Sequence, residues 1–215
     1  MNSLIVADCP PARSTYRHGD LRRALLDAGI ELARRGGPDA VVLREATRRA
    51  GVVPNAAYRH FASRQALLQA VRAAALAAVA SAMEAELAAL RPASLSPAAL
   101  ARASLRAVGT GYLRFAQTET GLFRTAFAVP VDVPDGADKG PHSGLNPFEL
   151  LGAALDRMVA CGLLPPERRP GAEYLAWSAV HGLAMLVLDG PLRRFTPAQT
   201  AAVGQRVLDM VEKGL

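Results

Sequence analysis

Cysteine is scarce in this chain of 215 residues, which contains only Cys9 and Cys161. Two cysteines cannot build the disulfide framework of a small secreted domain. No closely spaced set of cysteines and histidines predicts structural zinc either. The start of the chain has no basic stretch ahead of a long apolar run, so we expect no signal peptide. The sequence therefore predicts reduced thiols and a cytoplasmic location.

Aromatic residues make up only 5% of the chain, and alternating runs of β-branched residues are few. Alanine and leucine recur instead, and both favour helices. Hydrophobic residues reach 51%, as in a globular protein. The most apolar segment, Tyr174 to Leu188, is too short to cross a bilayer and contains His181 and Gly182. We expect an all-α protein without a membrane segment, in which this stretch is a buried helix.

Signatures of common enzymes are missing as well. The chain has no His-Glu-x-x-His pair, no P-loop and no dinucleotide fingerprint. None of its four histidines has a cysteine or carboxylate at ligand spacing. We therefore predict no enzyme activity, no metal and no cofactor. A helical enzyme or sensor without DNA binding stays an alternative, and so does a protein-interaction module. A membrane-surface binder is disfavoured, because no helix is strongly basic on one side and strongly apolar on the other.

The positive charge is concentrated at the beginning of the chain. Residues 1–65 hold 11 arginines, no lysine and 6 acidic residues, whereas the rest has 14 basic and 13 acidic residues. Nearly all of the net charge of +6 therefore lies in the first third. This asymmetry is typical of an anion-binding module followed by a nearly neutral domain. An apolar partner groove would not need so many arginines.

The spacing of apolar residues predicts a series of helices. Leu21, Leu25, Ala28 and Leu32 recur at helical steps over 20–35, and Gly36-Gly37-Pro38 ends that helix. Short helices follow over 43–50 and from Pro54 to about residue 61. A long helix capped by Ser63 then runs towards residue 90. This order is that of a helix-turn-helix.

Four more helices are expected after residue 96. They cover about 97–115, 147–162, 172–189 and 197–213, with a short helical piece at 122–127 and a mobile loop over 130–147. We divide the chain into a flexible arm at 1–17, a three-helix helix-turn-helix DNA-binding domain at 18–65, and a helical domain at 66–215.

The segment GVVPNAAYRHF, residues 51–61, carries the residues that a reading helix needs. Gly51 suits the tight turn between the two short helices. Asn55 is placed to pair with an adenine edge in the major groove. Tyr58, Arg59 and His60 can reach phosphates, and the closing phenylalanine would anchor the helix in the core. A DNA-reading helix explains this pattern better than a catalytic loop.

The stretch REATRRAGVVPNAAYRHFASRQALLQAV resembles the DNA-binding domain of the TetR family of transcriptional repressors over about residues 18–72. The shared pattern is a glycine turn, an aromatic, basic residues, a closing aromatic, and a basic residue ahead of paired leucines. The resemblance implies phosphate contacts by Tyr58, His60 and Arg64, and base contacts just before Tyr58. Our full set of DNA-binding candidates is Arg44, Arg48, Pro54, Asn55, Ala56, Tyr58, Arg59, His60 and Arg64. For Arg48 a solvated surface position is the plainer interpretation.

Two positions depart from the family pattern. The family usually has Ser or Thr where this chain has Val42 and Val53, and those residues cap the two short helices. The loss of such a cap costs about 1 kcal/mol. The departure bears on the operator contacts and on the stability of the module.

GYLRFAQTETGLFRTAFA and AWSAVHGLAML resemble the branch of the family with a C-terminal Trp…His-Gly signature, here Trp177, His181 and Gly182. The resemblance implies helices that bind a small apolar effector and pair two subunits through the last two helices. Our ligand-binding candidates are Tyr112, Phe115, Trp177 and His181, for which packing in the core is the alternative. The sequence thus predicts a ligand-responsive repressor that acts as a homodimer on a palindromic DNA operator.

Overall fold

A computed structural model describes residues 18–128 and 138–215, and its regular structure in these ranges is entirely helical. The prediction of an all-α protein is confirmed, while the predicted arm at 1–17 lies outside the described residues. The helices are α1 (His18–Gly36), α2 (Leu43–Arg49), α3 (Pro54–Tyr58), α4 (Arg64–Ala88), α5 (Pro97–Thr118), α6 (Thr120–Ala126), α7 (Pro147–Ala160), α8 (Ala172–Leu188) and α9 (Pro197–Gly214). Short 3-10 helices lie at η1 (Pro38–Ala40), η2 (Pro92–Ser94) and η3 (Pro166–Arg168).

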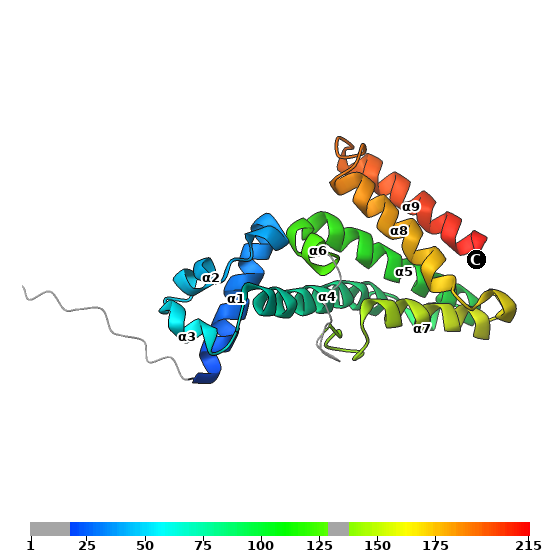
Figure 1. Cartoon of the computed structure of the whole chain (residues 1–215). Coiled ribbons are helices and arrows are strands. Elements are labelled where there is room, and N and C mark those ends of the chain that lie inside the picture. The colour runs from blue at the N-terminus through cyan, green and yellow to red at the C-terminus, as the bar shows by residue number, and fades with distance from the viewer. Residues whose placement is uncertain (1–17, 129–137) are drawn as a thin grey trace, which may run out of the picture.

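Figure 1 shows α1, α2 and α3 grouped at one end of the molecule, with α4 running from this group into the remaining helices. α4 packs against α1 on one side and against α5, α6 and α7 on the other. α8 and α9 pack on each other and on α5. The long helix therefore belongs to both parts of the protein and ties them together.

Capping side chains fix the starts of α4, α5, α7 and α9. Ser63 Oγ accepts a hydrogen bond from the N–H of Ala66 at 3.1 Å and begins α4, as predicted. Asn146 caps α7 and forms a capping box with Glu149. Thr196 does the same for α9. These polar residues satisfy backbone N–H groups that have no partner inside the helix.

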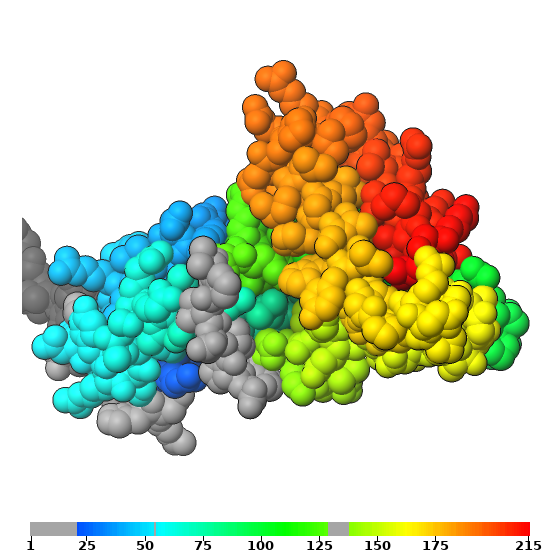
Figure 2. Space-filling model, turned by 45° about the vertical axis from the view of Figure 1, so that its right-hand side comes forward, coloured from blue at the N-terminus to red at the C-terminus, as the bar shows by residue number. Residues whose placement is uncertain are grey.

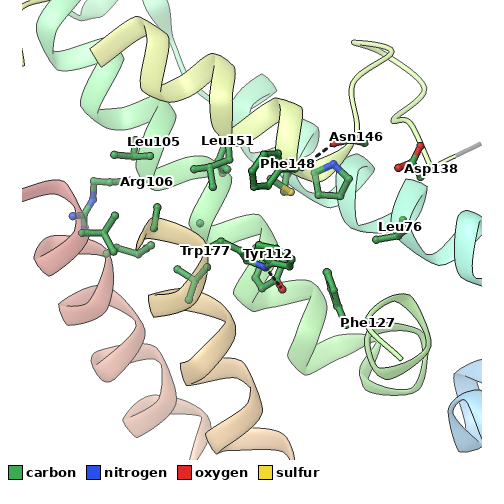
Figure 3. Close-up of a pocket in the computed structure, with 18 of the residues that line it drawn as sticks. Leu76, Leu105, Arg106, Tyr112, Phe127, Asp138, Asn146, Phe148, Leu151 and Trp177 are labelled. Carbon is green, nitrogen blue, oxygen red and sulfur yellow. Dashed lines mark hydrogen bonds between the residues drawn. The ribbon is translucent and has the colours of Figure 1, made fainter. Parts of the chain in front are cut away.

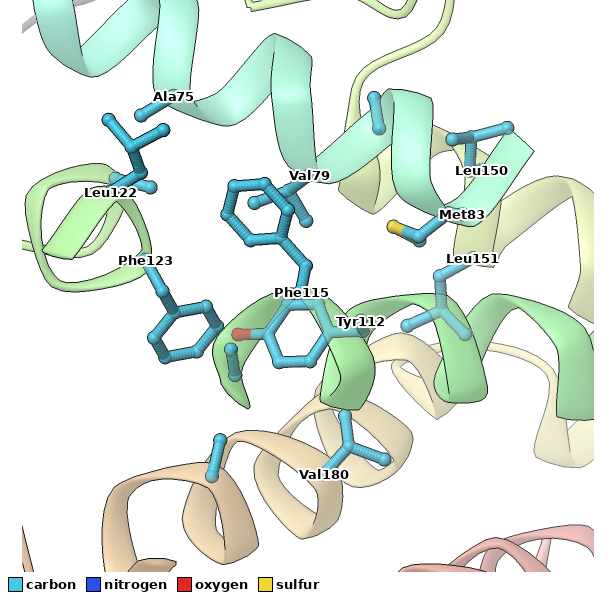
Figure 4. Close-up of a cluster of buried hydrophobic side chains, with 14 of the residues drawn as sticks. Ala75, Val79, Met83, Tyr112, Phe115, Leu122, Phe123, Leu150, Leu151 and Val180 are labelled. Atoms are coloured by element: carbon cyan, nitrogen blue, oxygen red, sulfur yellow. The ribbon is translucent and has the colours of Figure 1, made fainter. Parts of the chain in front are cut away.

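The core of the larger part lies where α4, α5, α6 and α7 meet (Figure 4). Phe115 of α5 points towards Val79 of α4 and is buried. Phe123 of α6 is completely buried and meets Tyr112 edge-on, with ring centroids 5.3 Å apart. Burial of such rings removes a large apolar area from water.

α8 is not the buried helix that its apolar sequence suggests. Tyr174 and Leu175 are 63% and 66% exposed, and Leu186 is 45% exposed. Only one face of α8, which includes Val180 and Leu183, is buried against its neighbours. Figure 2 shows α8 and α9, in orange and red, standing out from the body. The expectation of a buried helix is therefore wrong, because apolar composition does not say how many faces find a partner.

Among the described helices, α4 is the one long and apolar enough, by length and composition, to cross a membrane. The sequence pattern had drawn attention only to the apolar stretch of α8 as a possible membrane span. The core helix of a water-soluble protein passes the same test. α4 packs against four other helices, so its apolar residues are explained by the protein interior.

Candidate nucleic-acid interface and ligand cavity

The turn between α2 and α3 depends on Gly51. Its φ of 68° lies in the left-handed region, which residues with a Cβ avoid. The N–H of Val52 donates to Thr47 O at 3.1 Å and closes the turn. Beside it, Ala46 and Ala57 are completely buried where α2 and α3 meet α1. The predicted helix-turn-helix is present.

The side chains of α3 and of the residues directly after it point in two directions, into the core and towards solvent. Ala57 and Phe61 are buried, and the guanidinium of Arg22 lies 5.3 Å from the centroid of the Phe61 ring. On the other side, Asn55 is exposed and Tyr58 is 52% exposed. Arg59 is exposed, Ala56 and His60 are half-buried, and Pro54 begins the helix. The helix is thus anchored from behind and presents polar groups to solvent.

Neither short helix has a side-chain cap. The structure places Val42 and Val53 at the N-cap positions of α2 and α3, and neither side chain can accept a hydrogen bond. Val53 is 68% exposed, an unfavourable position for an apolar side chain in a free monomer. The two valines that replace the usual Ser or Thr therefore leave α2 and α3 without a side-chain cap.

Arg44 and Arg48 lie exposed on α2. Arg48 Nη2 donates to Glu45 Oε1 at 2.7 Å, and Arg49 Nε donates to the same oxygen at 3.0 Å. Hydrogen bonds from Arg48 and then Arg49 lower the pKa of Glu45 to about 2. Glu45 therefore stays charged and offsets part of the positive charge of this surface.

Arg64 is held by the backbone in front of α2. Its Nε donates to Val41 O and its Nη2 to Pro38 O, both at 2.8 Å. These bonds tie the start of α4 to the segment between α1 and α2. A guanidinium has five N–H donors, so Arg64 keeps donors for a phosphate as well. Its side chain is 44% exposed.

A cavity of about 210 Å³ lies in the larger part, lined from α4, α5, α7, α8 and α9 (Figure 3). Its lining is mostly apolar. Tyr112 and Trp177, both ligand candidates from the sequence, are among the lining residues. The others are Arg72, Leu76, Met83, Leu105, Arg106, Val108, Gly109, Phe127, Asp138, Asn146, Pro147, Phe148, Leu151, Ala176, Val180, Leu208 and Val211.

Tyr112, Trp177 and His181 form a hydrogen-bonded group beside the cavity. Trp177 Nε1 donates to Tyr112 Oη at 3.1 Å, and Tyr112 Oη lies 2.7 Å from His181 Nδ1. Burial raises the pKa of Tyr112 and lowers the pKa of His181, so both side chains are neutral at pH 7. With the proton on Nε2, neutral His181 accepts from the tyrosine hydroxyl, which itself accepts from Trp177.

The other two ligand candidates lie elsewhere. Phe115 is not among the lining residues and packs in the core against α4. His181 supports Tyr112 from outside the lining. Sequence reasoning missed Phe127, Phe148 and most aliphatic lining residues. Their apolar spacing marks only a helix face, and no residue type distinguishes a filled face from a hollow one.

Glu84 anchors the segment that precedes α7. The N–H of Ser143 donates to Glu84 Oε1 at 2.8 Å, the Ser143 hydroxyl donates to the same atom, and the N–H of His142 donates to Oε2 at 3.3 Å. Burial opposes the charge of Glu84, but these bonds prevail and lower its pKa. His142 and Ser143 are therefore held on α4, and the segment 138–146 brings Asp138 and Asn146 to the cavity. The first part of the predicted mobile loop, 130–137, lies outside the described residues.

α6 connects the cavity to α1. Arg72 lines the cavity and donates its Nε to Ala126 O, at the end of α6, at 3.0 Å. At the other end, Arg34 of α1 donates its Nε to Glu119 Oε2 at 2.8 Å. A Cβ at Gly121 would overlap the carbonyl oxygens of Ala33 and Arg34, so α6 and α1 touch through their backbones.

A basic, surface-exposed helix-turn-helix joined to a helical domain with an internal cavity is the architecture of a DNA-binding transcriptional regulator. Residues 25–71 match the family model of bacterial regulatory proteins, tetR family, and residues 105–211 match that of the tetracyclin repressor-like C-terminal domain. This chain belongs to the TetR family of DNA-binding transcriptional regulators, which are not enzymes.

Solved structures share this fold. A protein of unknown function from Rhodococcus sp. RHA1 is 25% identical, with a TM-score of 0.73, over 94% of this chain and 99% of its own. FadR from Bacillus subtilis, in complex with stearoyl-CoA, is 13% identical, with a TM-score of 0.65, over 90% and 98%. RolR, in complex with resorcinol, is 20% identical, with a TM-score of 0.57, over 90% and 88%. No curated protein has a matching sequence.

Proposed function

We propose that this protein is a ligand-responsive repressor that binds a palindromic operator as a homodimer. The observation that carries the proposal is α3, whose rear side chains are buried while Asn55, Tyr58 and Arg59 face solvent. A recognition helix must expose its polar residues in this way to enter a major groove. In this proposal Asn55 reads a base, whereas Tyr58, Arg59, His60 and Arg64 bind phosphates.

Dimerisation through α8 and α9 is supported by their exposed apolar side chains. Tyr174, Leu175 and Leu186 of α8 and Met210 of α9 are large, apolar and exposed. An exposed apolar patch on a protein of this size marks an interaction surface. Two copies joined there carry two α3 helices, and their separation sets the spacing of the operator half-sites.

The effector site in this proposal is the cavity lined by Tyr112 and Trp177. RolR and FadR were solved with a small molecule bound, which fits an effector for this chain. An occupant would touch Phe127 and Arg72, next to the end of α6, and α6 abuts α1. A ligand that prefers one position of α6 would shift the population of DNA-competent dimers by its difference in affinity for the two states.

We also propose that this chain belongs to the Trp…His-Gly branch of the family and that it acts in the cytoplasm. Trp177 and His181 share one face of α8 and both contact Tyr112, as expected if the Trp…His-Gly signature has a structural role. A bacterial repressor must reach its operator, and the DNA lies in the cytoplasm.

Selection of bound duplexes from a random DNA pool tests the central claim. We expect recovery of a palindrome whose half-sites are bound on one face of the duplex. Retention that does not respond to salt, or no retention, would instead favour a helical small-molecule-binding protein without an operator.

The dimer is tested by Leu175→Glu, measured by sedimentation equilibrium. The exposed site should accept a carboxylate without unfolding, while the charge disrupts the apolar surface. Leu95→Glu is the matched control, because Leu95 is also exposed but lies outside α8 and α9. A variant at Leu175 that dimerises as tightly as the Leu95 control would remove this face from the interface.

A further inference from the structure

The size of the cavity restricts what can occupy it. Its volume of about 210 Å³ lies below the range of about 300–1,000 Å³ for pockets that hold drug-sized ligands. An apolar protein cavity of about 150 Å³ holds one benzene molecule. The present volume therefore fits a substituted benzene or two fused rings, and it is too small to enclose a long acyl chain.

Aromatic side chains form one end of the cavity. The ring centroids of Phe127 and Phe148 each lie 6.0 Å from that of Trp177, and Tyr112 lies 5.6 Å from Phe127. Aromatic rings attract another ring at about 4.5–7 Å through offset or edge-to-face contacts. The rest of the wall is aliphatic and comes chiefly from Leu105, Val108, Leu151, Val180, Leu208 and Val211.

The charged lining residues favour a neutral occupant. Arg106 is paired with Asp209 and Glu212, so its charge is balanced. Arg72 contributes one positive charge to the lining, which the negative charge of Asp138 offsets. Asp138 brings a carboxylate to the lining. An anionic ligand would place a second negative charge near this carboxylate and would lose its own hydration, which is costly in an apolar site.

Hydrogen-bonding groups gather at one end. Figure 3 shows Asn146 next to Phe148 and Asp138 farther along the same side, near Leu76. The Oδ1 of Asn146 accepts from the N–H groups of Phe148 and Glu149, which leaves its NH₂ as a donor. Asp138 is an acceptor. A hydroxyl on a ligand can donate to the carboxylate or accept from the amide.

We propose that the effector is a neutral, compact aromatic molecule of one or two rings that carries a hydroxyl group or an N–H donor. Its ring lies among Phe127, Phe148 and Trp177, and its donor faces Asp138 and Asn146. This inference rests on the proposed role of the cavity as the effector site. It does not depend on the operator or on the dimer.

Trp177 is the single tryptophan of the chain, so its fluorescence reports directly on this cavity. The probes are para-propylphenol, the equally large anion para-propylbenzoate, and dodecanol as a neutral long chain. We expect para-propylphenol to quench Trp177 saturably and to bind at least about tenfold more tightly than the benzoate, because the charge must be desolvated. Calorimetry on the full chain provides the affinities independently of the fluorescence signal.

Ala176→Leu fills part of the cavity, because Ala176 is a buried lining residue. We expect about a tenfold loss of para-propylphenol affinity with an unchanged helical circular dichroism spectrum. Ala153→Leu, at an exposed position of α7, is the control and should bind like the wild type.

Several outcomes overturn the assignment. Tighter binding of dodecanol or of the benzoate than of para-propylphenol would show that the ligand is not a neutral, compact aromatic molecule. Absence of binding by all three probes, or full affinity in Ala176→Leu, would remove the aromatic site. Each of these results can occur while the DNA selection still recovers a palindrome. Failure of this inference is therefore distinguishable from failure of the proposed function.

Discussion

The two ends of α4 serve parts of the protein that differ in how function is built. Around its start, a few small helices expose Asn55, Tyr58 and Arg59 on a thin core. Farther along α4, thicker packing forms a cavity with Tyr112 and Trp177 in its wall. In the proposed function, the first part acts through its exposed side chains and the second through its cavity. Substitutions should therefore affect the first by changing a surface and the second by changing packing.

Gly121→Ala tests most severely whether the two parts are mechanically joined. The new Cβ must displace α6 from the backbone of Ala33 and Arg34. We expect a loss of about 3 kcal/mol in unfolding free energy, at the upper end for overpacking, together with weaker operator binding. Urea denaturation and DNA titration measure the two effects. Gly204→Ala is the control, since its Cβ meets only Leu113 at an ordinary 3.5 Å. Equal behaviour of the two variants would contradict a rigid junction.

Asn55→Ala tests the displayed surface alone. If Asn55 reads a base, the variant loses about 2 kcal/mol of operator affinity and keeps its non-specific affinity and its stability. Fluorescence anisotropy on operator and random duplexes gives both affinities. An unchanged site preference would exclude Asn55 from base reading.

Glu84→Gln tests how the segment 138–146 is held against α4. The variant loses charge-assisted bonds to Ser143 and His142, so we expect a destabilisation of about 1.5 kcal/mol at pH 7. The pKa of Glu84 in the folded protein lies below its ordinary 4.5. Its stabilisation is therefore fully present above pH 4.5 and is lost as pH falls through the lower folded value. Thermal melts of both proteins across this range should converge in acid. A constant difference would show that the charge has no part in it.

Val53→Thr should give the smallest effect and the opposite sign. A threonine at this N-cap can accept from a backbone N–H of α3, so we expect a gain of about 1 kcal/mol or less. Denaturation of the full chain measures it, and Val53→Ala separates capping from the removal of an exposed apolar group. If Thr and Ala behave alike, capping is not the cause.

The first part was the more predictable from sequence because its signals are local. Gly51 and Ser63 act within a few residues of their partners, and the sequence predicts both correctly. The second part depends on contacts distant in sequence. Glu84 meets Ser143, and Tyr112 meets His181, across separations of 59 and 69 residues. Helical periodicity gives a face to each helix but not the partner of that face.

The amino-acid sequence by itself determined that this protein is all-helical, that its positive charge is concentrated at one end, and that a short helix follows the turn at Gly51. Local periodicity, caps and charge are sufficient for these conclusions. Only the tertiary structure decided that Tyr112 and Trp177 border a hollow while Phe115 fills the core, and that one face of α8 remains exposed. Both outcomes depend on how side chains from five helices share the same volume, a property of their packing together and not of any single helix.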